Sequence, residues 1–232
     1  MKKNMLIILA ASVFLITSCS KDDDGYSLGK FWIGFGIVQN TDSTTDNYRI
    51  TMDNKKILIP VSVDFNIYDY VKDGDRIRVN YTILDDNANG NEPATEYYVR
   101  INSVSKILMK GIIDITEENQ DSIGNNPVDV KDIWVSDNLL NIEILYWGSN
   151  KTHFINIVKQ PGELNENTAQ PIEIELRHNN NNDEEIIPQT GFVSFQLNAL
   201  KIPNIDSVEF VVKGTNYSGK EFNYKGVYNY NN

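Results

Sequence analysis

The stretch Arg76-Ile77-Arg78-Val79-Asn80-Tyr81-Thr82-Ile83 alternates polar and apolar side chains from end to end. A period of two places every second side chain on the same face of an extended chain, so this stretch predicts a β-strand with one buried and one wet face. The turn Asp73-Gly74 precedes it and Asp85-Asp86 follows it, as expected for a strand that begins and ends at the surface.

Four further segments of the first half have strand patterns. They cover residues 30–38, 48–52, 55–59 and 97–101. Asp53-Asn54 separates the second from the third, which predicts a hairpin. Gly34 and Gly36 in the first segment favour a sharp bend or a close approach of another backbone. Five strands with early glycines predict a small closed barrel of the OB type over residues 26–110.

The second half, residues 111–232, predicts another unit built from strands. Its strand patterns cover residues 132–135, 140–147, 153–158, 172–177, 193–197, 208–212 and 222–227. Gly148-Ser149-Asn150 joins two of them as a hairpin turn would, and the whole pattern predicts an antiparallel β-sandwich. Residues 103–115 fit either a helical turn or a strand that continues into this unit, so the boundary is expected between about Lys106 and Pro127.

Composition supports the same fold class. Only four alanines follow residue 18, whereas all twelve tyrosines do, and Ile and Val are plentiful. Scarce alanine disfavours long helices, while β-branched and aromatic side chains suit a pleated, half-buried surface. The predicted fold class is therefore all-β, with an N-terminal OB-like barrel followed by a C-terminal antiparallel β-sandwich.

The N-terminus has the organisation of a bacterial lipoprotein signal. Lys2 and Lys3 precede an apolar run from Met5 to Ile16. A membrane-spanning helix needs about 20 apolar residues, so this shorter run predicts a signal peptide over residues 1–18. Ile16-Thr17-Ser18-Cys19 then resembles a lipobox, in which the Cys19 thiol is acylated and anchors the mature chain in the membrane. A secreted protein with an incidental free cysteine is the alternative.

An acidic tether follows over residues 19–25. Ser20-Lys21-Asp22-Asp23-Asp24 resembles the export signal that some Gram-negative lineages place after the lipidated cysteine. We therefore expect an outer-membrane lipoprotein exposed at the cell surface, with a plain solvated linker as the alternative. Once Cys19 is lipidated, no cysteine remains for a disulfide, and the mature fold depends on its hydrophobic core.

The charge of the chain limits its partners. The formal net charge is −11, and it becomes −13 when the signal peptide removes two lysines. An acidic body does not neutralise phosphates, so we expect no nucleic-acid partner. It also lacks a polybasic patch for the membrane surface, so the membrane is reached through the lipid on Cys19. A protein or a glycan partner remains open.

Several segments resemble the NigD-like lipoproteins. Besides the lipobox they are Trp32-Ile33-Gly34, Gly74-Asp75-Arg76-Ile77, Leu140-Asn141-Ile142, Tyr146-Trp147-Gly148, His153-Phe154-Ile155-Asn156 and Ile174-Glu175-Leu176-Arg177-His178-Asn179. The resemblance spans the mature chain and implies an N-terminal OB-like domain and a C-terminal β-sandwich. It brings no catalytic or binding residues. The family takes its name from a gene beside a bacteriocin gene, so the resemblance also implies a role in bacteriocin immunity.

The residue types that carry catalysis are sparse. The two histidines, His153 and His178, lack the spacing of metal ligands. His153 shares strand parity with Ile155 and Ile157, which predicts a hydrogen-bonded histidine on a buried face, whereas His178 at a strand end is expected to be solvated. The sequence contains no nucleophile elbow, phosphate loop or His-Glu-x-x-His motif. We expect no catalytic residue, no metal and no cofactor.

Two acidic segments also have plain structural interpretations. The loop 178–185 offers many oxygen atoms to a hard cation, but it lacks the spacing and central glycine of a calcium loop and is more typical of a disordered hairpin tip. Glu173 and Glu175 share one strand face and are expected to be its solvated side.

Aromatic side chains offer a binding alternative. An OB-like sheet with exposed rings can stack sugars, and the residues considered are Tyr97, Tyr98, Tyr224, Tyr228 and Tyr230. Aromatic residues of β-domains more often form core or edge cover. We predict a non-enzymatic binding module that sequesters a protein partner through its acidic surface, with a glycan-binding accessory lipoprotein as the alternative.

Overall fold

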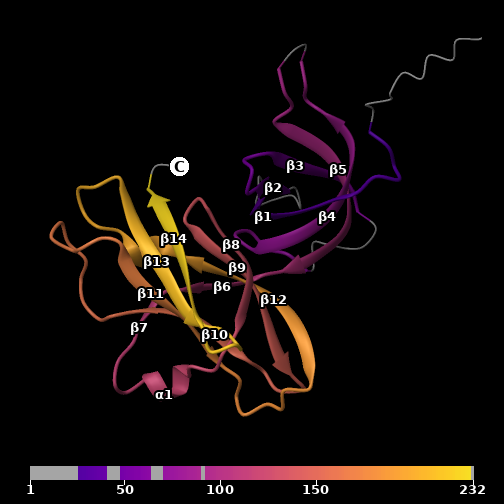
Figure 1. The fold of residues 1–232 in the computed structure, drawn as a ribbon. Coiled ribbons are helices and arrows are strands. Elements are labelled where there is room, and N and C mark those ends of the chain that lie inside the picture. The colour runs from indigo at the N-terminus through magenta and orange to yellow at the C-terminus, as the bar shows by residue number, and fades with distance from the viewer. Residues whose placement is uncertain (1–25, 41–47, 64–69, 90–91, 231–232) are drawn as a thin grey trace, which may run out of the picture.

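The computed structural model describes residues 26–40, 48–63, 70–89 and 92–230. The predicted signal peptide, Cys19 and the export signal Ser20 to Asp24 lie outside these residues. The described chain forms two units built from strands, which lie side by side and are joined where the first unit runs into the second (Figure 1). This all-β architecture confirms the predicted fold class. Among the described residues, no helix is both long and apolar enough to cross a membrane.

The first unit is a closed five-stranded barrel in the order β1-β2-β3-β5-β4. Its strands are β1 (Trp32–Asn40), β2 (Tyr48–Met52), β3 (Ile57–Val63), β4 (Arg76–Asp86) and β5 (Glu96–Lys106). All neighbours pair antiparallel except β3 and β5, which are parallel. Inward-facing Ile77 and Val79 of β4 are fully buried, as the alternating pattern predicts.

The two glycines of β1 allow the close approach that the sequence predicts. A Cβ atom on Gly34 would lie 2.5 Å from Cε of Met52, and one on Gly36 would lie 2.7 Å from Cγ2 of Ile50 and 2.8 Å from the carbonyl oxygen of Thr51. Such contacts are closer than carbon atoms tolerate. Glycine therefore lets the core side chains of Ile50 and Met52 of β2 pack directly against the backbone of β1 inside the barrel.

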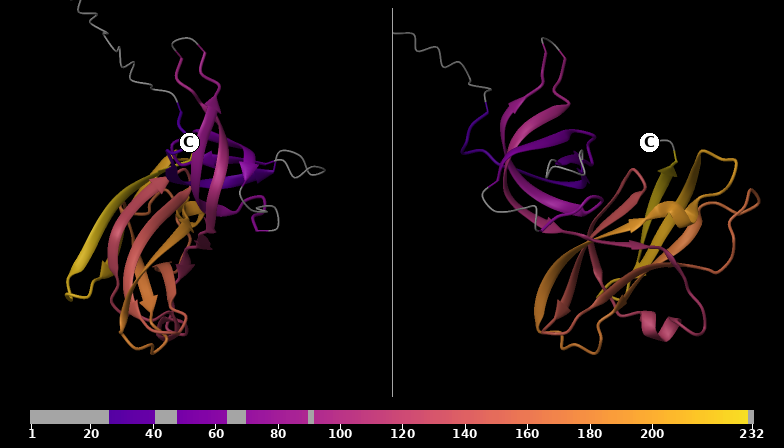
Figure 2. Two further views of the ribbon diagram at one scale, coloured as in Figure 1. Left: turned by 90° about the vertical axis from the view of Figure 1, so that its right-hand side faces the viewer. Right: turned by 180° about the vertical axis from the view of Figure 1, so that it is seen from behind.

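The second unit is a sandwich of two sheets, ordered β14-β13-β11-β10-β7 and β6-β12-β9-β8. The elements of this unit are β6 (Leu108–Gly111), β7 (Ile113–Asp114), α1 (Gln120–Ile123), β8 (Asp129–Ser136), β9 (Leu139–Gly148), β10 (Phe154–Lys159), β11 (Ile172–Asn179), β12 (Ile187–Gln196), the 3₁₀ helix η1 (Leu197–Leu200), β13 (Ser207–Thr215) and β14 (Glu221–Asn229). The two sheets of the sandwich lie face to face (Figure 2). The core between them includes Leu140, Phe195, Ile174 and Phe210, all fully buried.

Three strand pairs of the sandwich are parallel: β6 with β12, β7 with β10, and β11 with β13. The first two arise because the chain leaving the barrel gives one short strand to each sheet. Residues 108–114 are therefore extended, which answers the choice between helix and strand left open by the sequence. The remaining pairs are antiparallel. The predicted hairpin through Gly148-Ser149-Asn150 is wrong, because β9 pairs with β8 and β12 whereas β10 lies in the other sheet, so this turn carries the chain from one sheet to the other.

The barrel rests on the outer face of the four-stranded sheet. Leu140 and Ile142 of β9 point into the core. Asn141 and Glu143 alternate with them along the strand and therefore point outward. In register, Asn141 lies between Trp134 of β8 and Ser194 of β12. Glu143 lies in the next row, between Asp132 and Phe192. The candidate site includes side chains from these two rows.

Candidate functional site

A buried arginine joins the two units. Arg76, the first residue of β4, is only 2% exposed. Its Nη1 and Nη2 donate to the two carboxylate oxygens of Asp53 at 2.5 and 2.7 Å, and Asp53 lies in the turn between β2 and β3. Nη2 also donates to Oδ1 of Asn141 at 2.8 Å, across the boundary between the units. A buried guanidinium needs such paired acceptors to offset its loss of hydration.

Further polar side chains of the sandwich complete this junction network. The hydroxyl of Ser194 donates to Oδ1 of Asn141 at 2.7 Å, and Nδ2 of Asn141 donates to the hydroxyl of Ser136 at 2.9 Å. The indole Nε1 of Trp134 donates to Oδ2 of Asp53 at 3.0 Å. We call Arg76, Asp53, Asn141, Ser194, Ser136 and Trp134 the junction network. It fixes the barrel on the sheet by hydrogen bonds between residues far apart in the sequence.

Aromatic rings pack beside the junction network. The Phe35 ring from β1 lies 5.1 Å from the ring of Trp134 and 5.1 Å from that of Phe192. Two guanidinium groups of the protein already lie over these rings: Arg76 at 5.7 Å from the Phe35 centroid and Arg78 at 5.6 Å from the Phe192 centroid. The contact between the units is therefore both polar and aromatic.

A hollow opens at this junction. Its volume is ≈ 320 Å³, and it is lined by Gly34, Phe35, Met52, Asp53, Asn54, Asp132 and Trp134. The lining comes from both units, so the hollow exists only because the barrel and the sandwich are docked. Its walls combine rings and a thioether with carboxylate groups, which is the composition of a site that orients an amphipathic or cationic group.

A second polar network lies in the sandwich alone. His153 immediately precedes β10, His178 lies in β11, and Asp183 lies between β11 and β12. Nδ1 of His153 is 2.8 Å from Nε2 of His178, and Nε2 of His153 is 3.2 Å from Oδ2 of Asp183. Nδ1 of His178 donates to the carbonyl oxygen of Pro127 at 2.8 Å. The side chains of His153 and Asp183 are only 3% and 2% exposed.

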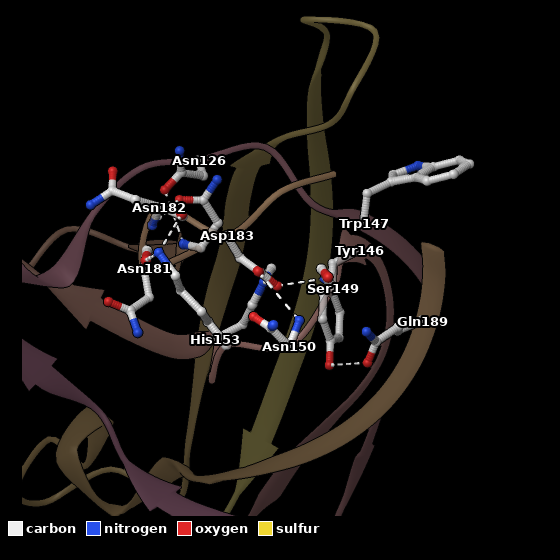
Figure 3. A network of polar contacts seen from close by, with 12 residues as sticks. Asn126, Tyr146, Trp147, Ser149, Asn150, His153, Asn181, Asn182, Asp183 and Gln189 are labelled. Atoms are coloured by element: carbon white, nitrogen blue, oxygen red, sulfur yellow. Dashed lines mark hydrogen bonds and ion pairs between the residues drawn. The ribbon is translucent and has the colours of Figure 1, made fainter. Parts of the chain in front are cut away.

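Asp183 also closes the turn after β9. Its carboxylate accepts the backbone N–H of Ser149 at 2.6 Å and that of Asn150 at 3.3 Å, as Figure 3 shows. Tyr146 packs its ring 4.6 Å from the ring of His153, whereas Trp147 points to the opposite side of β9. We call His153, His178 and Asp183, with the Pro127 carbonyl and the Ser149–Asn150 amides, the histidine network.

The hydrogen bonds of the histidine network engage all four ring nitrogens. The Pro127 carbonyl and the Asp183 carboxylate are acceptors, so each receives an N–H from a histidine. The two remaining nitrogens, Nδ1 of His153 and Nε2 of His178, lie 2.8 Å apart. Each ring nitrogen is then engaged in a bond within the protein.

The surroundings of the network shift two pKa values. Backbone hydrogen bonding, led by the Ser149 N–H, holds the pKa of Asp183 well below its usual range. Burial lowers the pKa of His178, and the nearby His153 lowers it further. Among the described residues, no cluster of His, Cys, Asp or Glu suits a metal ion.

The structure corrects one histidine prediction and confirms the other. His153 is buried and hydrogen-bonded, as predicted. The prediction that His178 is solvated is wrong, because the side chain of that residue is buried with 1% exposure. His178 shares strand parity with Ile172, Ile174 and Leu176 and so belongs to the inward face of β11. The same alternation can be seen in the sequence and would have predicted that His178 is buried.

The acidic loop is ordered by a residue that the sequence did not single out. The expected disordered tip over residues 178–185 is wrong, because Asp183 is buried and binds the Ser149–Asn150 turn. By contrast, Glu173 and Glu175 lie on the outer side of their strand, where they pair with Lys213 and Arg177. Their predicted role as a solvated face is confirmed.

The aromatic residues considered for glycan stacking are mostly part of the fold. Tyr97 and Tyr228 are buried, at 9% and 2% exposure, and Tyr228 donates its hydroxyl to Asn198. Tyr230 accepts the backbone N–H of Ile202, and Tyr224 packs against the sandwich core. Tyr98 is half-buried. The structural interpretation of Tyr97 and Tyr228 is therefore confirmed. These two rings are buried and cannot stack on a glycan at the surface.

Comparison with known families agrees with this two-unit architecture. Residues 35–107 match the NigD-like N-terminal OB domain, and residues 111–226 match the NigD-like C-terminal beta sandwich domain. The chain belongs to the NigD-like family. The two matches meet at residues 107–111, where β6 follows the last barrel strand.

Three solved structures resemble this NigD-like chain. A protein of Parabacteroides distasonis described as toxin-related is 28% identical, with a TM-score of 0.71 over 87% of this chain and 95% of that one. A NigD-like immunity protein of Bacteroides caccae is 17% identical, with a TM-score of 0.59 over 86% and 93%. A protein of Bacteroides fragilis described as a lipoprotein is 12% identical, with a TM-score of 0.55 over 87% and 98%. No protein with a curated description matches the chain.

Proposed function

We propose that this NigD-like protein is a lipid-anchored protein of the outer membrane, exposed at the cell surface, that works as a non-enzymatic binding module. Its partner is a protein, and its role is bacteriocin immunity by sequestration. The lipid on Cys19 holds the module at the membrane, and the acidic residues 20–24 direct it to the outer face.

The observation that carries the proposal is the engagement of the buried polar groups. All four ring nitrogens of His153 and His178 have partners within the protein, as do Asp183 and the guanidinium of Arg76. A general base needs a ring nitrogen or carboxylate directed at a substrate. These networks instead hold strands and turns together, which supports a rigid scaffold that presents a surface.

Charge and similarity support a protein partner. The acidic chain attracts basic proteins over distances of about a Debye length and accelerates their encounter. The descriptions of two similar proteins, one as toxin-related and one as an immunity protein, support a toxin as the partner of this chain. The lipobox, together with the similar protein described as a lipoprotein, supports the anchor.

The anchor is tested in intact cells. Cys19→Ala should move the protein out of the membrane fraction, and protease added to intact cells should degrade the wild type. A Cys19→Ala protein that stays in the membrane would contradict lipidation. Wild-type protein that resists the added protease while a surface-exposed control is degraded would contradict exposure.

The binding role is tested with the mature chain. Bacteriocin-sensitive cells that express the protein should survive a basic bacteriocin from a neighbouring strain, and cells that express Cys19→Ala should not. The purified mature chain should bind that bacteriocin less tightly as salt is raised, because salt screens the charges that attract it. Equal killing of cells with and without the protein, over a panel of basic bacteriocins, would reject the immunity role.

A further inference from the structure

Two carboxylates face each other beside the junction hollow. Asp132 of β8 and Glu143 of β9 are cross-strand neighbours in register, on the outer face of the four-stranded sheet. Like charges directly opposite one another destabilise a sheet. Among the described residues, neither carboxylate forms an ion pair, and the bond recorded for Asp132 is to the N–H of Ile133, its own neighbour, at 2.8 Å.

Three nearby cations of the protein are engaged elsewhere. Arg76 is paired with Asp53, Lys55 is paired with Asp137, and Arg78 lies over the Phe192 ring. Asp53 is therefore neutralised within the junction network, and its position is fixed by Arg76 and Trp134. The unbalanced negative charge on this surface belongs to Asp132 and Glu143.

The aromatic part of the hollow is also suited to a cation. Guanidinium groups already lie over Phe35 and Phe192, so this ring cluster binds cations within the protein. Trp134 lines the hollow, and in the described part of the chain no cation lies over its ring. Indole is the best of the aromatic side chains for a cation–π contact.

From this juxtaposition we propose that the hollow formed by Phe35, Met52 and Trp134, with Asp132 in its wall and Glu143 next to Asp132 in register, binds an arginine or lysine side chain of a basic protein partner. The volume of ≈ 320 Å³ lies at the lower limit of ligand pockets, so it suits one long side chain inserted from a larger surface. The aliphatic stem packs on Met52 and the rings, and the charged head reaches the two carboxylates.

This inference rests on the proposed binding function and names its contact point. Because the lining comes from both units, the site depends on their docking through Arg76 and Asp53. A partner that inserts a cation here contacts the barrel and the sandwich at once. Charge complementarity between this acidic edge and a basic partner then sets the orientation of the complex.

The test uses a small probe and the mature chain. N-acetyl-arginine amide is titrated while the Trp134 indole N–H is followed by NMR, with N-acetyl-citrulline amide as the neutral probe of the same shape. We expect a saturable shift of the Trp134 signal with the arginine probe and a much weaker response to citrulline. Equal responses to the two probes would overturn the proposal.

Two double variants test whether the carboxylates of Asp132 and Glu143 bind the cationic probe. Asp132→Asn with Glu143→Gln should weaken binding of the arginine probe about fivefold, as expected for the loss of two exposed ion pairs. Glu173→Gln with Glu175→Gln removes the same charge from the other sheet and should leave binding unchanged. Equal weakening in both double variants would show a diffuse charge effect and overturn the site.

The same variants separate this inference from the proposed function. If cells with Asp132→Asn and Glu143→Gln keep full immunity to a bacteriocin that the wild type resists, the binding module stands and the site is wrong. If the arginine probe binds as expected but no basic bacteriocin is resisted, the site stands and the immunity role is wrong.

Discussion

The junction network and the histidine network both stabilise buried polar side chains, but they do so with different chemical groups. Each buries polar side chains contributed by elements far apart in the sequence and supplies each of them with partners. The junction network depends on a guanidinium, which stays charged at every physiological pH. The histidine network depends on two imidazoles, and imidazole is the side chain whose ordinary pKa of about 6.5 lies near neutrality. The contact between the two units should therefore resist pH changes that loosen the far end of the sandwich.

The largest effect should come from breaking the junction network. Asp53→Ala leaves the guanidinium of Arg76 buried without its counter-ion, which costs about 3–5 kcal/mol in the free energy of unfolding. Chemical denaturation at pH 7 measures this loss. Glu173→Ala, which removes the exposed partner of Lys213, is the matched control and should cost less than about 1 kcal/mol. Similar losses for both variants would show that burial of Arg76 is not what matters.

The next largest effect should come from breaking the histidine network. His178→Ala removes two hydrogen bonds and leaves the Pro127 carbonyl and Nδ1 of His153 without partners, which costs about 2–3 kcal/mol. His178→Asn retains a donor for Pro127 and should lose less. Denaturation midpoints of the two variants at pH 7 give the comparison. Equal losses would show that the ring, and not its hydrogen bonds, stabilises this region.

Acidification should separate the two networks. Burial lowers the pKa of His178, so the unfolded chain takes up a proton more readily than the folded one. The stability that His178 contributes is therefore complete above its ordinary pKa of about 6.5 and falls as the pH drops below that value. Asp183, whose pKa is also lowered, adds a further loss at more acidic pH.

The pH dependence is measured by unfolding between pH 7.5 and 5. The wild type should lose stability over this range, and His178→Asn should lose less, because that variant has no imidazole to protonate at this position. Asp53→Ala should keep the wild-type dependence on pH while being less stable throughout. An unchanged slope in His178→Asn would contradict the assignment of the acid sensitivity to the histidine network.

The smallest effect should have the opposite sign. Asp132→Asn removes a like-charge contact with Glu143 and should raise the stability by a few tenths of a kcal/mol. Glu173→Gln removes a carboxylate that is paired with Lys213 and should not stabilise. Thermal unfolding at low salt compares the two. Destabilisation by Asp132→Asn would mean that this carboxylate has a partner on its own surface and would weaken the proposed cation site.

Much of the fold could be predicted because local patterns carry it. Alternation in residues 76–83 identified β4, and alternation in residues 172–176 identified β11 with its solvated Glu173 and Glu175. Gly34 and Gly36 marked the close approach of β2 residues to the backbone of β1. The same alternation extends to His178, so its burial was also within reach of the sequence.

The contents of the two networks could not be predicted in this way. Arg76 belongs to the outward face of its strand, and a polar residue on that face is normally solvated. Arg76 is buried because the sandwich covers this part of the barrel. The local sequence pattern around Arg76 does not predict this contact between the two units. Asp183 lies in a run of Asn, Asp and Glu that is typical of a solvated loop, yet its carboxylate is buried and accepts backbone N–H groups of the turn after β9.

The sequence by itself determined the strands, the two-unit order and the family of this protein, and it predicted the anchor at Cys19. These features depend on periodicity, composition and short motifs, which neighbouring residues express together. Only the tertiary structure decided which polar residues are buried, that Phe35 and Trp134 meet, and that Asp132 opposes Glu143 beside a hollow. The physical reason is that these contacts join separate elements, so they exist only after register and docking have been fixed.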